Sequence, residues 1–153
     1  MKKTPVDLRL KPQEVQRQWT QDGIPVLCLT MSLPLCTAPL QNRRIRRMNR
    51  YYETFRRSYE AYCGKFLFPQ AAEAFRMACG ESRPFTPWQT EVSFSTTLRS
   101  GTLWSLVIDA VENTGGEPFR LRRADTWDLR DGYPLALADF FPGEPLPLRR
   151  LRR

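Results

Sequence analysis

Two aspartates lie inside predicted strands of this chain, and paired carboxylates can hydrolyse glycosidic bonds without a histidine. Asp109 shares the strand parity of Val107, and Asp125 shares that of Trp127. A carboxylate among apolar neighbours can stay protonated at neutral pH, as a general acid must. The same two side chains could instead accept hydrogen bonds from the backbone or from nearby arginines. The sequence leaves both interpretations of the pair open.

Other catalytic chemistries are restricted by composition. None of the 153 residues is a histidine, which excludes Ser-His and Cys-His nucleophile systems and removes the main ligand of common zinc and iron sites. Cys28, Cys36, Cys63 and Cys79 form no C-x-x-C motif, so we expect free thiols, with a Cys63–Cys79 pairing left open. Phosphate-binding, dinucleotide-binding and EF-hand motifs are absent. We therefore expect no catalytic residue, no metal and no cofactor.

Positive charge is concentrated in one segment and one tail. The chain has a formal charge of +8, and residues 43–65 hold eight Lys and Arg against two Glu. An arginine-rich first turn opposes the helix dipole, which favours anions at that end. An acidic partner, another subunit or water could relieve this. The candidate ligand-binding arginines are Arg43, Arg46, Arg47 and Arg50. An alternative function is anion or nucleic-acid binding by the Arg43–Arg57 helix and the C-terminal arginines, with Tyr51 stacking on a base.

Apolar spacing predicts one long helix and one short helix. A stripe with alternating steps of three and four runs along residues 41–66, as expected for a helix that buries one face. Its members are Ile45, Met48, Tyr52, Phe55, Tyr59, Tyr62 and Phe66. Pro69 then starts a short helix that ends near Cys79. We expect the stripe to cover a sheet, with Phe55 near its centre.

The second half of the chain predicts an antiparallel meander. From Trp88 the pattern has period two, and three or four strands reach Leu137, with Trp104 on a buried face. Gly115–Gly116 and Gly132 fall where the chain must reverse, and Asp139 closes the last strand. Residues 24–40 lack charge, but their three prolines favour a strand in the same sheet over a membrane span.

The predicted fold class is α+β: an antiparallel meander sheet with one long and one short helix packed on one face. Residues 1–22 are expected to be irregular, 23–142 to form a single domain, and 143–153 to form a basic, disordered tail. No segment resembles a signal peptide, which predicts a cytoplasmic location.

One region resembles a known family. Thr114, Gly115 and Gly116 followed by a D-x-x-x-G-x-x-L-x-L-x-D-x-F turn resemble the RsiV-like extracytoplasmic sensor domains, also found beside the catalytic domain of peptidoglycan deacetylase PdaC. The turn pattern falls on Asp128, Gly132, Leu135, Leu137, Asp139 and Phe141. The resemblance implies a ligand-binding module and not a catalyst, with a protein or cell-wall ligand; the RsiV-like relatives bind lysozyme outside the cytoplasm. Gly115 and Gly116 join the arginines as candidate ligand-binding residues.

Overall fold

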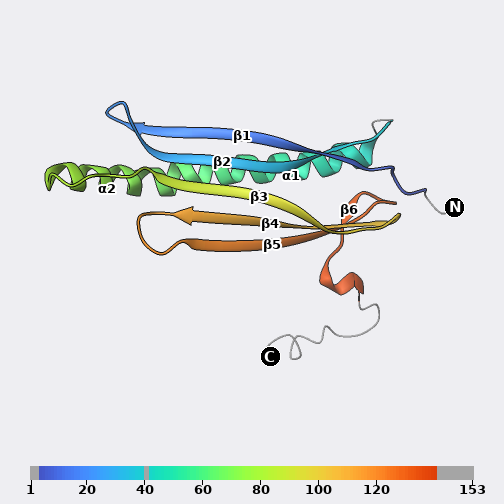
Figure 1. The fold of residues 1–153 in the computed structure, drawn as a ribbon. Coiled ribbons are helices and arrows are strands. Elements are labelled where there is room, and N and C mark those ends of the chain that lie inside the picture. Colours follow the sequence, from blue (N-terminus) through green and yellow to red (C-terminus); the bar gives the residue numbers. More distant parts are fainter. Residues whose placement is uncertain (1–3, 40–41, 141–153) are drawn as a thin grey trace, which may run out of the picture.

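A computed structural model of the chain describes residues 4–39 and 42–140. It has an α+β fold in which a six-stranded sheet carries a helical rod on one face (Figure 1). The elements are β1 (Arg9–Gln21), β2 (Ile24–Thr37), α1 (Arg43–Tyr62), a π-helical turn (Cys63–Leu67), α2 (Phe68–Gly80), β3 (Trp88–Arg99), β4 (Leu103–Asn113), β5 (Phe119–Asp128), β6 (Tyr133–Pro134) and a 3-10 turn (Leu137–Phe140). The predicted fold class is confirmed. The predicted tail, 143–153, lies outside the described residues.

The strand order β1-β2-β3-β4-β5-β6 follows the chain. Strands β2 and β3 pair in parallel, from Leu27 opposite Trp88 to Met31 opposite Val92. Parallel neighbours need a long crossover, and α1 and α2 provide it. The strands from β3 to β6 pair antiparallel. The predicted meander is therefore confirmed, as is the position of β2 in the same sheet.

The expectation of an irregular segment before residue 23 is wrong for 9–21, which form β1. This strand pairs along β2 through a tight turn at Asp22 (φ 53°) and Gly23 (φ 78°), the D-G sequence that favours such hairpins. Strand β1 is an edge strand with one face in water, so few of its side chains are apolar. Only Leu10, Val15 and Trp19 pack against the core, too few to give a period-two signal.

The last predicted strand, which was expected to reach Leu137 and to end at Asp139, is also displaced. The structure places β6 at Tyr133–Pro134 and a 3-10 turn at Leu137–Phe140. The Leu135 N–H still donates to the Thr126 carbonyl at 2.7 Å. Asp139 closes the turn, because its carboxylate accepts from the Ala136 N–H at 2.7 Å.

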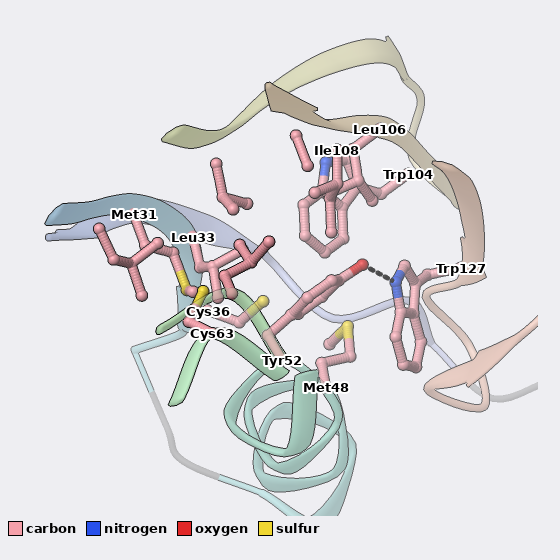
Figure 2. Close-up of a cluster of buried hydrophobic side chains, with 14 of the residues drawn as sticks. Met31, Leu33, Cys36, Met48, Tyr52, Cys63, Trp104, Leu106, Ile108 and Trp127 are labelled. Carbon is pink, nitrogen blue, oxygen red and sulfur yellow. Dashed lines mark hydrogen bonds between the residues drawn. The ribbon is translucent and has the colours of Figure 1, made fainter. Parts of the chain in front are cut away.

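The core lies between α1 and the sheet, where Figure 2 shows Tyr52 between Met48 and two tryptophans, Trp104 and Trp127. All four of these side chains are buried. The remaining stripe residues Phe55, Tyr59 and Tyr62 are half-buried and pack against the core.

Phe66 is the exception in the predicted stripe, because 61% of its surface is exposed. The cause is the π-helical turn, which lies between α1 and α2 and joins them into one rod. A π turn holds more residues than an α turn, so the helix changes phase. Cys63 and Leu67 point inward in place of Phe66.

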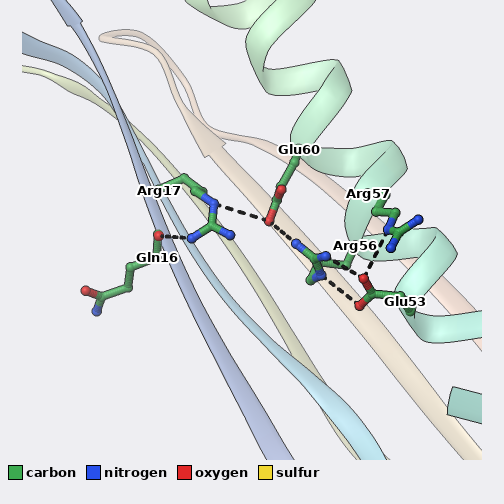
Figure 3. Close-up of polar contacts among 6 residues, drawn as sticks. All are labelled: Gln16, Arg17, Glu53, Arg56, Arg57 and Glu60. Carbon is green, nitrogen blue, oxygen red and sulfur yellow. Dashed lines mark hydrogen bonds and ion pairs between the residues drawn. The ribbon is translucent and has the colours of Figure 1, made fainter. Parts of the chain in front are cut away.

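A chain of ion pairs ties α1 to β1 (Figure 3). The Arg17 Nε lies 3.7 Å from Glu60, and Glu60 accepts from Arg56 at 2.7 Å. Arg56 and Arg57 both donate to Glu53. The hydrogen bond from Arg56 is the main cause that lowers the pKa of Glu53 to about 2. The arginines in the second half of α1 are therefore neutralised.

The four cysteines are free, as expected, so the Cys63–Cys79 pairing is not formed. Burial raises the pKa of both the Cys36 and the Cys63 thiol to about 12. Within residues 4–39 and 42–140, no helix has the length and apolar character to cross a membrane.

Candidate functional site

The first turn of α1 carries positive charge without a compensating acid. Asn42 caps the helix by accepting hydrogen bonds from the Arg44 and Ile45 N–H groups at 3.0 and 3.2 Å. No acidic residue lies in that turn. The positive end of the helix dipole therefore adds to the arginine side chains and does not offset them.

Two of the arginines have structural partners. Arg44 Nη1 donates to the carbonyl oxygens of Thr4 and Arg130, at 2.6 and 3.1 Å. Arg47 Nη1 donates to the Asp131 carbonyl at 2.8 Å, and its guanidinium lies over the Tyr133 ring at 3.5 Å. These contacts fix the start of α1 against the β5–β6 turn.

Gly132 makes this contact possible. Its φ is +69°, and a Cβ there would lie 2.6 Å from the Arg44 Cβ and 2.8 Å from the Arg44 Cα. Any other residue would strain the turn and push the helix backbone away. The structural role expected of Gly132 thus has a specific cause.

Arg43, Arg46 and Arg50 have no carboxylate partner among the residues that the structure describes. Together with Arg47 they line a shallow groove of about 460 Å³. We call these four residues the arginine face. The structure thus brings together the four candidate arginines from the sequence. Arg46, Arg47 and Arg50 follow Arg43 by three, four and seven residues and so share one side of α1.

A second hollow of about 410 Å³ continues from Arg47 and Arg50 toward β5. The guanidinium of Arg123 lies 5.0 Å from the centre of the Tyr51 ring there and also faces Phe55. Arg123 was not among the predicted site residues. Arg123 shares the strand parity of Asp125 and therefore lies on the helix-facing side of β5. This parity is readable from the sequence and could have identified Arg123 as a candidate site residue.

The hydrolytic pair is contradicted by the geometry, because Asp109 and Asp125 lie on opposite faces of the sheet. Asp109 faces away from the helix and accepts from Arg122 at 2.7 and 3.1 Å. The Arg122 guanidinium lowers the pKa of Asp109, the reverse of what a general acid needs. Asp125 faces the helix and accepts from the hydroxyls of Tyr51 and Tyr52 at 3.1 and 3.2 Å.

A matching contact occurs further along α1. Glu112 is buried, and its carboxylate accepts from the hydroxyls of Tyr59 and Tyr62, each at 3.1 Å. Burial raises the pKa of Tyr62 to about 12 and that of Tyr59 further. In the described part of the chain, every buried side-chain nitrogen and oxygen has a partner. The carboxylates between helix and sheet thus have structural contacts already.

The glycine pair lies elsewhere. Gly115 (φ +89°) and Gly116 belong to the turn between β4 and β5. The arginine face instead borders the opposite end of β5, through the hydrogen bond from Arg47 to the Asp131 carbonyl. Figure 1 shows the two ends separated by the length of the strands. The nominated glycines and arginines therefore do not form one site.

No cluster of three or more metal-binding side chains occurs in residues 4–39 and 42–140.

Trp104, expected in the core, is fully buried and donates its indole N–H to Thr96 at 3.1 Å.

Two solved structures have a similar architecture. A member of the DUF3298 family from Bacteroides fragilis is 15% identical, with a TM-score of 0.66 over 90% of this chain. A DUF3298 family protein from Pseudomonas aeruginosa PAO1 is 15% identical, with a TM-score of 0.52 over 95% of this chain. This chain has the fold of these DUF3298 proteins. It spans 62% of the length of each. At such low identity the likeness to DUF3298 proteins establishes the fold alone. No protein-family model and no curated protein matches the sequence.

Proposed function

We propose that this protein is a non-catalytic binding domain that recognises an anionic ligand through the arginine face. The observation that carries the proposal is that Arg43, Arg46 and Arg50, beside the positive end of α1, have no carboxylate partner within residues 4–39 and 42–140. Guanidinium groups bind carboxylates and phosphates through paired, charge-assisted hydrogen bonds. An acidic ligand would therefore relieve repulsion that the described part of the fold leaves uncompensated.

The shape of the site favours an extended ligand. Arg43 and Arg50 are seven residues apart on one helix, a rise of about 10 Å. The groove between them is shallow and lined by side chains of one charge. A chain with several acidic groups, such as an acidic protein segment or a cell-wall polymer, fits this surface better than a small enclosed molecule. The resemblance to RsiV-like sensor domains supports a protein or cell-wall ligand, and the acidic character of that ligand rests on the arginine face alone.

The nucleic-acid alternative has less support from the geometry. Tyr51 was the residue expected to stack on a base. Its hydroxyl donates to Asp125, its ring meets Trp127 edge-on at 5.0 Å, and Arg123 lies over the ring. A base would have to displace Arg123 to stack on Tyr51.

The test compares two triple variants with the same loss of charge. The first replaces Arg43, Arg46 and Arg50 by alanine. The control replaces three exposed cations away from the arginine face, which are Lys65 in the π-helical turn, Arg76 in α2 and Arg83 after α2. Binding to polyglutamate and to inorganic polyphosphate is measured by isothermal titration calorimetry at fixed salt.

We expect the first variant to bind at least about tenfold more weakly, since each lost charged contact costs about 0.5–1 kcal/mol at an exposed site. The control should stay close to wild type. Equal weakening of both variants would mean that only net charge matters, and the proposed site would be wrong. Comparing the two polymers shows whether carboxylate or phosphate is preferred.

A further inference from the structure

The outer edge of β5 is open along most of its length. Among the described residues only Tyr133–Pro134 pairs with it, opposite Trp127 and Asp128. Residues 119–126 therefore have β4 on one side and no described strand on the other. We call this stretch the β5 edge. Open strand edges present backbone N–H and C=O groups that another strand can pair with.

The register identifies the free backbone groups. The Thr126 carbonyl already points to the open side, because it accepts from the Leu135 N–H at 2.7 Å. In an antiparallel strand the outward-pointing residues alternate. Arg120, Arg122 and Ala124 therefore present their N–H and C=O groups outward. The β4–β5 ladder has no bulge that would interrupt this row.

Two large apolar side chains border the same edge on the helix-facing side. Phe119 and Leu121 are 59% and 57% exposed. They share the strand parity of Arg123, which lines the hollow between α1 and β5. Exposed apolar side chains beside an open strand edge are a feature of interaction surfaces.

Charge determines which strand would fit. Residues 119–125 contain three arginines. Arg122 is paired with Asp109 on β4 and Arg123 with Asp125, whereas Arg120 has no carboxylate partner among the described residues. An antiparallel pair of two β5 edges centred on Arg122 would place like charges directly opposite each other, which is destabilising. A second copy of this chain is therefore a poor partner. An acidic strand has complementary charge.

The other edge of the sheet differs. Strand β1 carries Pro12 and a register shift at Trp19 and Thr20. Proline and irregularities of this kind prevent strand pairing at an edge. The β5 edge has neither of these features.

We infer that the β5 edge binds an extended acidic segment of another protein as an added strand. Alternate residues of that segment would be apolar, facing Phe119 and Leu121, and acidic, facing Arg120 on the other side of the sheet, beside the Arg122–Asp109 pair. Backbone pairing provides affinity and the alternating side chains provide specificity. This surface is distinct from the arginine face and does not depend on that site.

The test uses two substitutions of one exposed residue. Ala124→Pro removes an outward N–H while leaving the β4 ladder intact, whereas Ala124→Val keeps the N–H and favours a strand. A display library of short random peptides is selected on the wild-type protein. The enriched peptides are then titrated against the wild type and both variants by fluorescence anisotropy.

We expect enrichment of sequences that alternate acidic and apolar residues. Ala124→Pro should weaken their binding at least about tenfold, and Ala124→Val should not. If Ala124→Pro fails to fold, as judged by circular dichroism, the pair Phe119→Glu and Leu121→Glu replaces it, and the same loss is expected. No enrichment, enrichment of basic peptides, or unchanged binding by the folded variants would overturn the inference. So would a wild-type dimer in sedimentation that Ala124→Pro abolishes, because the occupant would then be a second copy.

Discussion

Tyr52 makes the hydrogen bonds that join α1 to the sheet at the centre of the core, so deletion of its hydroxyl is an informative perturbation. The hydroxyl accepts from the Trp127 indole N–H at 2.7 Å (Figure 2). It also donates to Asp125 at 3.2 Å. Tyr52→Phe keeps the ring and removes both bonds. Trp127 is fully buried, so its N–H would be left without an acceptor.

The expected cost follows from these two losses. An orphaned buried donor costs about 1–3 kcal/mol, and a hydrogen bond to a charged group is worth about 1.5–3 kcal/mol. Asp125 keeps donors from Tyr51 and Arg123, so part of the second loss is recovered. We expect Tyr52→Phe to lower the free energy of unfolding by about 2–4 kcal/mol. A chain of this length would melt roughly 5–15 °C lower.

Urea denaturation followed by circular dichroism measures the change. Two matched control variants each remove the hydroxyl group of another tyrosine. Tyr51→Phe removes one donor to Asp125 and orphans no buried N–H, so it should cost less than Tyr52→Phe. Tyr133→Phe acts on a tyrosine that is 54% exposed and should change stability by under about 0.5 kcal/mol. A Tyr52→Phe protein as stable as Tyr133→Phe would refute this account of the core.

Three further predictions concern other parts of the fold. Glu53 has a folded pKa of about 2, mainly through its hydrogen bond to Arg56. Its contribution to stability is complete above its unfolded pKa and is lost as pH falls from about 5 through 2. In acid titrations of unfolding free energy, Glu53→Gln should remove this part of the pH dependence; an unchanged slope would contradict the ion-pair chain. Gly132→Ala should cost more than about 1–2 kcal/mol, from positive φ and the clash with α1, whereas Gly101→Ala, with open space around it, should be nearly neutral in the same denaturation assay. Cys79 should react with a maleimide reagent in the native protein, whereas the buried Cys36 and Cys63 should react only after unfolding. Mass spectrometry measures the order of labelling, and labelling of Cys36 or Cys63 before Cys79 would contradict the burial of these thiols.

The sequence predicts those elements whose side chains repeat with a clear period. The α1 stripe and the strands β3, β4 and β5 have such periods because one face of each meets the core. Strand β1 lacks this signal, since its partner β2 supplies nearly all the apolar contacts of that pair. The exposed position of Phe66 was not predictable from spacing, because the π-helical turn changes the helix phase without changing composition.

The candidate site was predictable in part. The arginines of α1 share one helix, so their spacing alone brings them together. Gly115 and Gly116 required the register of β4 and β5 to show that they lie at the other end of the sheet. For Asp109 and Asp125, parity within each strand was readable from the sequence. The faces that they occupy depend on how β4 pairs with β5, which places Asp109 opposite Arg122.

The most direct test of the proposed function is a nuclear magnetic resonance titration of the arginine Nε–Hε signals with polyglutamate. Signals from Arg43, Arg46 and Arg50 should shift together and saturate at one common dissociation constant. Signals from Arg56, held between Glu53 and Glu60, should not move. Shifts spread evenly over exposed arginines such as Arg76 and Arg83, or no saturation, would contradict an anion-binding site at the start of α1.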